Sequence, residues 1–120
     1  MAGTSWKNET METQYATRAP ERADIEAMPG PVLLEFGTGW CGYCRAAAPL
    51  VAGALAGHET VRHIKVEDGS GRVLGRSFGV KLWPTLVFLN DGVELARVVR
   101  PRDLDELRKA LGTIDPDAAG

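Results

Sequence analysis

The chain has 120 residues, of which 44% are hydrophobic and 25% charged, and its formal net charge at pH 7 is -2. This length and composition predict one compact domain that needs neither disulfides nor metal to build a core. Acidic and basic residues are interspersed, which argues against nucleic acid or an anionic membrane as a partner.

The hydropathy pattern predicts a cytoplasmic protein. No apolar run reaches the roughly 18 residues of a membrane span. The N-terminal residues lack the apolar core of a secretory signal, although an exported protein whose signal had been removed would look the same.

The first third of the chain combines a polar start with one strongly apolar strand. Residues 1–20 predict a flexible segment with at most a short edge strand near 14–17. A short helix is expected at 21–28, where a Pro-Gly-Pro sequence closes it. The apolar run at 32–36 predicts a strand that is covered on both faces, as in a parallel sheet.

The middle of the chain predicts a helix, a strand and a weak helix. After Cys41 the apolar residues recur at helical spacing as far as Gly57. The run 61–67 alternates as a strand, with Val61, His63, Lys65 and Glu67 on one side. Residues 71–78 predict at best a short helix, because Gly75 weakens it.

The last third predicts a β-hairpin and a helix. The strands 85–89 and 93–99 flank Asn90-Asp91-Gly92, a tight-turn sequence. Asp103 and Glu106 form a capping box for a helix that we expect to end before Gly112. The order predicts an α/β domain over 21–113, with a mixed central β-sheet flanked by helices on both faces, and a flexible tail at 114–120.

The two cysteines, Cys41 and Cys44, lie three positions apart where a strand gives way to a helix. On one helix face this spacing gives about 5–6 Å, within the Cα range of a disulfide. At the first turn, free backbone N–H groups and the helix dipole stabilise a thiolate on Cys41, while Cys44 lies deeper. The pair therefore offers an attacking and a resolving sulfur.

Spacing alone also leaves a metal site and a packing role open for the cysteines. Cys41, Cys44, His58 and His63 fall close to a Cys2His2 zinc pattern, although such a finger places both histidines on one helix. Here His58 follows the predicted helix and His63 falls in a strand. In the packing role the pair would be two unreactive core thiols, because free cysteine is commonly buried.

Two stretches resemble the thioredoxin family. The run VLLEFGTGWCGYCRAAAPL is similar to its active-site strand and helix, and FGVKLWPTLVFLNDG is similar to its second conserved stretch. The resemblance covers about residues 21–112. It implies a protein thiol–disulfide oxidoreductase in which Cys41 attacks a substrate disulfide and Cys44 resolves the mixed disulfide, with no cofactor beyond this pair.

The resemblance also implies roles for polar residues near the pair. The family carries an acid six positions before the nucleophile, which is Glu35 here, as the acceptor of the Cys44 proton. We expect burial to raise the pKa of Glu35, whereas on an exposed strand face it would be an ordinary solvated carboxylate. His63 occupies a position where many thioredoxins have Lys, so its coupling to Glu35 would titrate near neutral pH.

The substrate face is implied in the same way. Pro84 corresponds to the family's cis-proline, and the backbone at Trp83 would pair with an extended substrate. Trp40, Gly42 and Tyr43 would complete this face. Packing is the alternative role for Trp40 and Trp83.

Two residues depart from the family pattern. Tyr43 stands where many thioredoxins have Pro, as in oxidases and isomerases of the superfamily, which leaves the direction of electron flow open. Arg100 replaces a loop that usually carries Gly; near Cys41 its charge would favour the thiolate, and otherwise it is a solvated strand-end residue.

We expect the protein to be a monomer that reduces protein disulfides. A thioredoxin reductase-like electron donor would then reduce its oxidised cysteine pair again. Two alternatives stay open. One is an oxidase or isomerase in an exported compartment, and the second is a non-catalytic module that captures extended peptides.

Overall fold

The computed structural model describes residues 14–116, so the flexibility expected for 1–13 and 117–120 concerns residues outside the described part. Within the described residues, four helices and four strands follow the expected order. They are α1 (Arg22–Glu26), β1 (Pro31–Gly37), α2 (Gly42–Leu55), β2 (Arg62–Glu67), α3 (Val73–Ser77), β3 (Thr85–Asn90), β4 (Val93–Val99) and α4 (Leu104–Ile114). Within 14–116, no helix has the length and apolar character that crossing a membrane requires.

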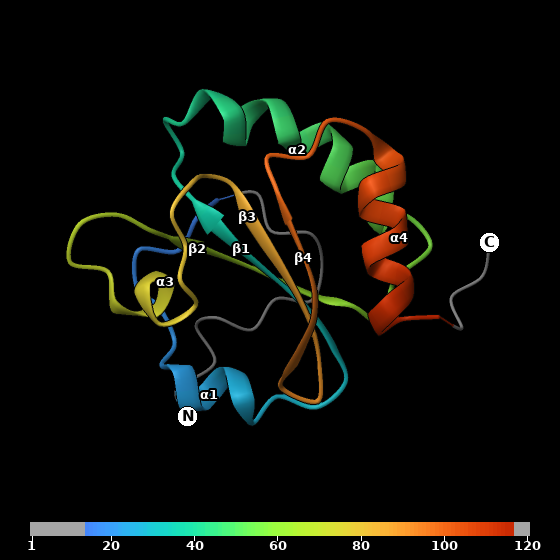
Figure 1. The fold of residues 1–120 in the computed structure, drawn as a ribbon, viewed down its shortest axis with the longest axis horizontal. Helices are drawn as coiled ribbons and strands as arrows, with labels where there is room; N and C mark the ends of the chain where they lie inside the picture. The colour runs from blue at the N-terminus through green and yellow to red at the C-terminus, as the bar shows by residue number, and fades with distance from the viewer. Residues whose placement is uncertain (1–13, 117–120) are drawn as a thin grey trace.

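The strands form one mixed sheet in the order β2-β1-β3-β4 (Figure 1). The β1–β2 pair is parallel, as the α2 crossover between the two strands requires. The β1–β3 and β3–β4 pairs are antiparallel, and the tight turn at Asp91 and Gly92 joins the last two strands. The mixed sheet expected from the element order is confirmed.

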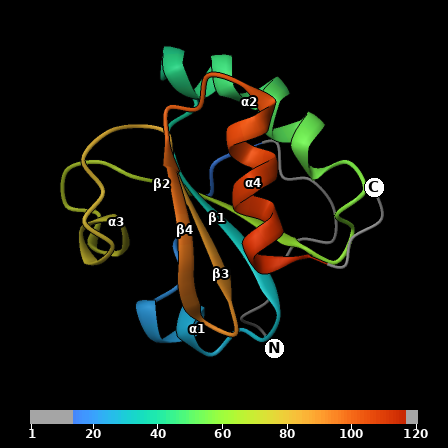
Figure 2. The ribbon, with the colours of Figure 1, turned by 45° about the vertical axis from the view of Figure 1, so that its right-hand side comes forward.

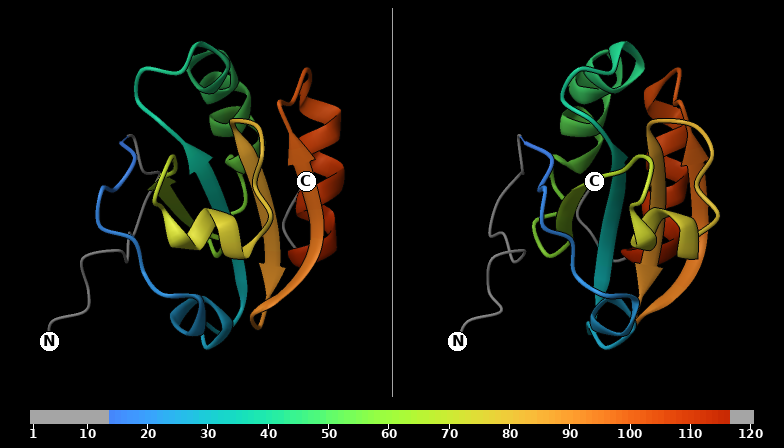
Figure 3. Two further views of the ribbon diagram at one scale, coloured as in Figure 1. Left: turned by 60° about the vertical axis from the view of Figure 1, so that its left-hand side comes forward. Right: turned by 90° about the vertical axis from the view of Figure 1, so that its left-hand side faces the viewer.

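Each face of the sheet has its own apolar core, because successive side chains of β1 point to opposite sides. Val32, Leu34 and Phe36 face α1 and α3, where they meet Ile25 and Phe78. Leu33 faces the other way, into the cluster formed with α2 and α4. Figures 2 and 3 show α2 beside α4 on one face of the sheet and α3 across the other. Glu35 shares the face of Leu33 and is therefore directed to the side of α2.

Helix α4 does not end before Gly112 but continues to Ile114, so the predicted C-terminal boundary was too early. Ile114 is buried against the α2–α4 side of the sheet, and Asn90 Nδ2 donates to its carbonyl at 2.8 Å. Burying an Ile side chain contributes about 1.5–3 kcal/mol, whereas a helical Gly costs about 1 kcal/mol. The packing of Ile114 therefore outweighs the low helix propensity of Gly112.

The structured part of the chain begins before residue 21. Ala16 forms a parallel bridge with Val66, in which its N–H donates to the Lys65 carbonyl and its carbonyl accepts from the Glu67 N–H, both at 2.9 Å. The short edge strand expected near residues 14–17 is thus present as a single bridge on the outer side of β2. Residues 14–20, which we expected to be flexible, contribute Tyr15 to the interior described below.

Candidate active site

The two cysteines lie at the start of α2, above the carboxyl end of β1. Cys41 is the N-cap residue, and its Sγ accepts a hydrogen bond from the Cys44 N–H at 3.2 Å. Both cysteines are free thiols with little exposure, 8% for Cys41 and 3% for Cys44. The cap position places Cys41 Sγ at the N-terminus of α2, beside backbone N–H groups that have no partner in a preceding turn. The expected asymmetry between an outer and an inner sulfur is present.

Burial and the neighbouring Cys41 raise the pKa of Cys44 to about 11, although the Thr38 backbone N–H and the Tyr15 hydroxyl act in the opposite direction. A thiol with such a pKa is almost entirely protonated at neutral pH. Cys44 therefore needs a proton acceptor before it can attack another sulfur.

Glu35 is a buried carboxyl group that is linked to Cys44 through Tyr15, which interacts with both residues. Its side chain is 1% exposed, so the solvated alternative is excluded. Its Oε1 lies 2.8 Å from His63 Nε2, and its Oε2 accepts a hydrogen bond from the Tyr15 hydroxyl at 2.7 Å. Pairing of β1 with β2 brings Glu35 opposite Lys65, and His63 lies two residues away on the same face. The expected contact of Glu35 with His63 is confirmed.

The expected direction of the Glu35 pKa was wrong. Burial does raise it, but the hydrogen bond and charge of His63, the charge of Lys65 and the Tyr15 hydrogen bond together outweigh burial and hold the pKa below 4.5. Glu35 is therefore an ionised carboxylate at neutral pH, able to accept a proton without first losing one. His63 Nδ1 is buried and has no hydrogen-bond partner among residues 14–116.

This lowered pKa predicts a pH dependence of stability. The folded-state pKa of Glu35 lies below its unfolded value, so ionised Glu35 stabilises the fold above the ordinary pKa of 4.5, and this contribution is lost as the pH falls through the folded-state pKa. Urea unfolding of the wild type and of Glu35→Gln from pH 7 to 3 measures it. We expect the difference in unfolding free energy between the two proteins to shrink on acidification; a constant difference would contradict the assignment.

The loop before β3 meets the cysteine end of α2. The Trp83-Pro84 peptide bond is cis, as the resemblance implied. Trp40 is 72% exposed and packs edge-on against Trp83, with ring centroids 5.7 Å apart. Trp83 is half-buried, and its indole N–H donates to Asp68 Oδ2 at 2.9 Å. Trp83 is therefore a fixed wall of the surface rather than a core residue.

Arg100 lies at this face and is not a solvated strand end. Its Nε donates to the Trp83 carbonyl at 2.8 Å, and its guanidinium carbon lies 3.8 Å from the centroid of the Tyr43 ring. Arg100 has a φ of 51°, a left-handed conformation that a non-glycine residue adopts at some cost. Arg100 thus links the loop before β3, through Trp83, to the first turn of α2, through Tyr43.

The zinc alternative does not fit the geometry. A helix follows the cysteine pair, His58 Nδ1 lies 2.9 Å from Asp115 Oδ2, and His63 is held by Glu35 inside the sheet. Within residues 14–116, no three His, Cys, Asp or Glu side chains gather as metal ligands would.

A cavity of about 470 Å³ opens beside Cys44. Tyr15 and Lys65 line it from the outer side of β2, and Arg45 lines it from α2. The cavity thus borders Cys44, although the Cys44 side chain itself is almost fully buried.

Sequence reasoning missed two residues of this arrangement, Tyr15 and Asp68. Asp68 had one indirect signal: a Cβ at Gly75 would clash with its carboxylate, so a glycine in the short helix α3 leaves room for the partner of Trp83. Tyr15 had no signal, because it lies in a polar segment without periodicity.

Comparisons with known proteins agree with this geometry. The family model "Thioredoxin" matches residues 11–113. "Thioredoxin Asp f 28" of Aspergillus fumigatus is 34% identical over 85 residues, covering 68% of this chain and 79% of that protein. The thioredoxin of Chlamydia muridarum is 33% identical over 82 residues, covering 68% and 80%.

Among solved structures, reduced thioredoxin 2 from Pseudomonas aeruginosa PAO1 has 52% sequence identity and a TM-score of 0.80, over 90% of this chain and all of that one. A thioredoxin mutant from Halobacterium salinarum has 28% identity and a TM-score of 0.68, over 85% and 89%. With its Cys-Gly-Tyr-Cys pair at the start of α2 and this family match, the chain belongs to the thioredoxin family and is a thiol–disulfide oxidoreductase.

Proposed function

We propose that the protein reduces disulfides of other proteins in the cytoplasm, as a monomer that receives electrons from a thioredoxin reductase-like donor. The observation that carries the proposal is the asymmetry of the pair: Cys41 caps α2, and Cys44 lies behind it with a pKa of about 11. A sulfur at the helix N-terminus beside a protonated inner thiol suits attack on a substrate followed by internal resolution.

The reaction then runs in two exchanges. Cys41 thiolate attacks a substrate disulfide, forms a mixed disulfide and expels the first substrate sulfur. Cys44 loses its proton toward Glu35 and attacks Cys41 Sγ, so the second substrate sulfur leaves. The substrate gains two electrons and two protons overall, and Cys41–Cys44 becomes a disulfide.

The face around Cys41 is where we place the substrate. An extended segment would lie over Gly42 and along the backbone before Pro84, between the aromatic side chains of Trp40, Tyr43 and Trp83. The exposure of Trp40 and of Tyr43, 72% and 59%, supports this assignment, because large exposed aromatics are typical of binding surfaces.

A coupled assay tests the direction of electron flow. The protein is mixed with NADPH, a bacterial thioredoxin reductase and insulin, and NADPH consumption is followed with insulin precipitation. We expect consumption that depends on both the protein and insulin. Faster formation of disulfides in reduced ribonuclease, with no reduction of insulin, would contradict the proposal in favour of an oxidase or isomerase.

A further inference from the structure

Before Cys44 can attack Cys41, the proton of its thiol must be transferred to an acceptor, and the path from Cys44 to Glu35 is the open question. With a pKa of about 11, roughly one Cys44 in 10⁴ is ionised at pH 7. Glu35 is the ionised acceptor, but each of its oxygens already has a partner: His63 lies at Oε1 and Tyr15 at Oε2. Each of these partners therefore offers a hydrogen-bonded path by which a proton from Cys44 can reach Glu35.

Tyr15 is the partner that also lies beside Cys44. An ideal Cβ placed on Gly37 would lie 2.5 Å from Cys44 Sγ and 2.8 Å from the Tyr15 hydroxyl oxygen. The two atoms therefore flank the same small space at the end of β1, a space that exists because residue 37 has no side chain. The Tyr15 hydroxyl is also 2.7 Å from Glu35 Oε2, so it lies between the thiol and the carboxylate.

We propose that Tyr15 relays the proton of Cys44 to Glu35. As Cys44 Sγ attacks Cys41 Sγ, its proton passes to the Tyr15 hydroxyl oxygen while the hydroxyl proton passes to Glu35 Oε2. The Cys41–substrate bond breaks, the substrate sulfur leaves as a thiolate, and the Cys41–Cys44 bond forms. Tyr15 begins and ends the step as a neutral phenol, and the assignment rests on the proposed role of Glu35 as acceptor.

The relay must be concerted rather than stepwise. Burial and the neighbouring Glu35 carboxylate raise the pKa of Tyr15 well above its ordinary value, so a free phenolate does not form at neutral pH. A hydroxyl that accepts one proton while it donates another avoids this state, because it never carries a full charge.

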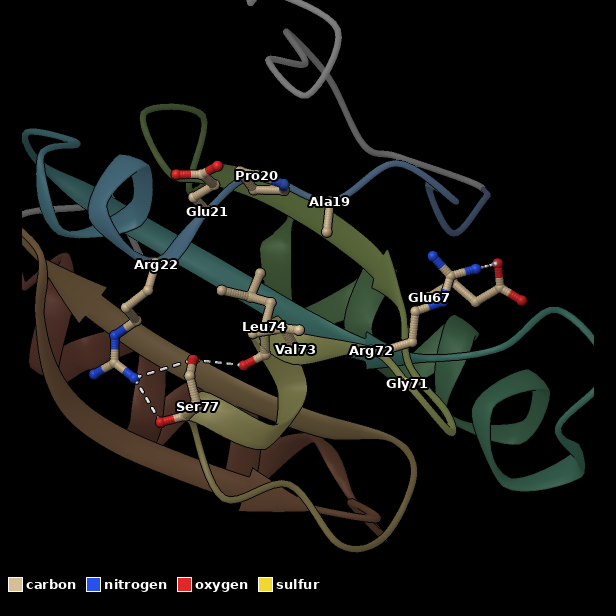
Figure 4. Close-up of a pocket in the computed structure, with 10 residues that line it drawn as sticks. All are labelled: Ala19, Pro20, Glu21, Arg22, Glu67, Gly71, Arg72, Val73, Leu74 and Ser77. Atoms are coloured by element: carbon tan, nitrogen blue, oxygen red, sulfur yellow. Dashed lines mark hydrogen bonds and ion pairs between the residues drawn. The ribbon is translucent and has the colours of Figure 1, made fainter.

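The segment that carries Tyr15 is held in place at the two residues that follow it. Ala16 is bonded twice to β2, and Arg72 Nη1 donates to the Thr17 carbonyl at 2.6 Å. Figure 4 shows Arg72 paired with Glu67 at the wall of a second cavity, of about 480 Å³, between this segment and α3. The Lys65 ammonium lies 4.3 Å from the Tyr15 ring centroid. The hydroxyl therefore has a defined position.

Other titratable groups also face this site. Cys41 caps α2 beside Cys44, His63 and Lys65 flank Glu35 from β2, and Arg45 and Glu67 line the cavity next to Cys44. A test of the relay must therefore change the hydroxyl alone and leave these groups in place.

Tyr15→Phe makes this change, because it keeps the ring and removes the oxygen. Excess dithiobis(nitrobenzoate) is mixed with the reduced protein in a stopped-flow instrument. Cys41 attack releases the first thionitrobenzoate and Cys44 attack the second, so the second phase reports resolution. In the wild type we expect its rate to be nearly constant between about pH 6 and 9, where Glu35 is ionised and Cys44 protonated.

In Tyr15→Phe we expect a second phase at least about tenfold slower at pH 7 that rises about tenfold per pH unit, since the rate then follows the Cys44 thiolate. Glu35→Gln should show the same profile, and the double variant should lose nothing further, because both act in one relay. Thr17→Ala is the matched control on the same segment. The Thr17 side chain is exposed, so the rate and the pH profile of the second phase in Thr17→Ala should equal those of the wild type.

The outcomes separate the relay from the proposed function. A wild type that never releases the second thionitrobenzoate contradicts dithiol exchange itself. Normal release with an unchanged rate and flat profile in a folded Tyr15→Phe overturns the relay alone. A second check uses the wild type alone and measures the rate of resolution in mixtures of H2O and D2O. Two protons that move in one step predict a curved dependence of this rate on the fraction of D2O. A linear dependence would overturn the relay.

Discussion

Replacing Cys41 with Ser should abolish disulfide reduction. A serine hydroxyl does not form the sulfur–sulfur bond of the mixed disulfide, so turnover of insulin should fall by about 10³-fold or more, as expected for loss of a nucleophile. The measurement is insulin reduction with dithiothreitol as electron donor, read against the uncatalysed rate. The small change at a helix N-cap, where Ser is itself a favoured residue, leaves the fold intact.

The same variant separates an enzyme from a peptide-binding module. A non-catalytic module would not accelerate insulin reduction, and its affinity for an extended peptide would be the same in Cys41→Ser as in the wild type, whereas an oxidoreductase loses turnover in this variant. Retention of the wild-type rate by Cys41→Ser would therefore contradict a catalytic role for the pair, and Arg108→Ala, an exposed change on α4, provides a control that should keep that rate.

Replacing Cys44 with Ser should produce a different defect of similar size. Cys41 still attacks the substrate, but no inner thiol resolves the adduct, so the protein stops as a mixed disulfide. We expect about a 10³-fold loss of turnover together with a stable covalent complex.

Mass spectrometry of Cys44→Ser after exposure to a peptide disulfide measures this trapped state. The expected mass is that of the protein plus one peptide thiol, and dithiothreitol should remove the peptide. Adducts on the wild type and on Cys44→Ser in equal amount and lifetime would show that Cys44 does not resolve. Cys41→Ser is the matched control and should give no adduct.

The sheet and its order could be predicted because each strand carries a local signal. The apolar run of β1, which only Glu35 interrupts, indicates burial on both faces, and the Asp91-Gly92 turn indicates the β3–β4 hairpin. Helix α4 was predicted too short because Gly112 has a low propensity, and the burial of Ile114 that outweighs it depends on the whole fold.

The cysteine pair and the cis-proline could also be predicted, since each belongs to a short stretch that resembles the family. The proton-transfer site could be predicted only in part. The alternation of residues in β2 predicted that His63 and Lys65 lie on the same side of the strand. It did not predict that this side is the one on which Glu35 lies. The sign of the Glu35 pKa follows from those partners and from Tyr15, which lies in another segment, so burial alone gave the wrong direction.

The reduction potential of the Cys41–Cys44 pair tests the central claim most directly. The protein is equilibrated in graded dithiothreitol buffers, and its free thiols are trapped and counted. A cytosolic reductase should show one reversible two-electron transition at about -270 mV. A potential of about -180 mV or above would contradict the reductive assignment in favour of an oxidase or isomerase, and no reversible transition would contradict dithiol exchange altogether.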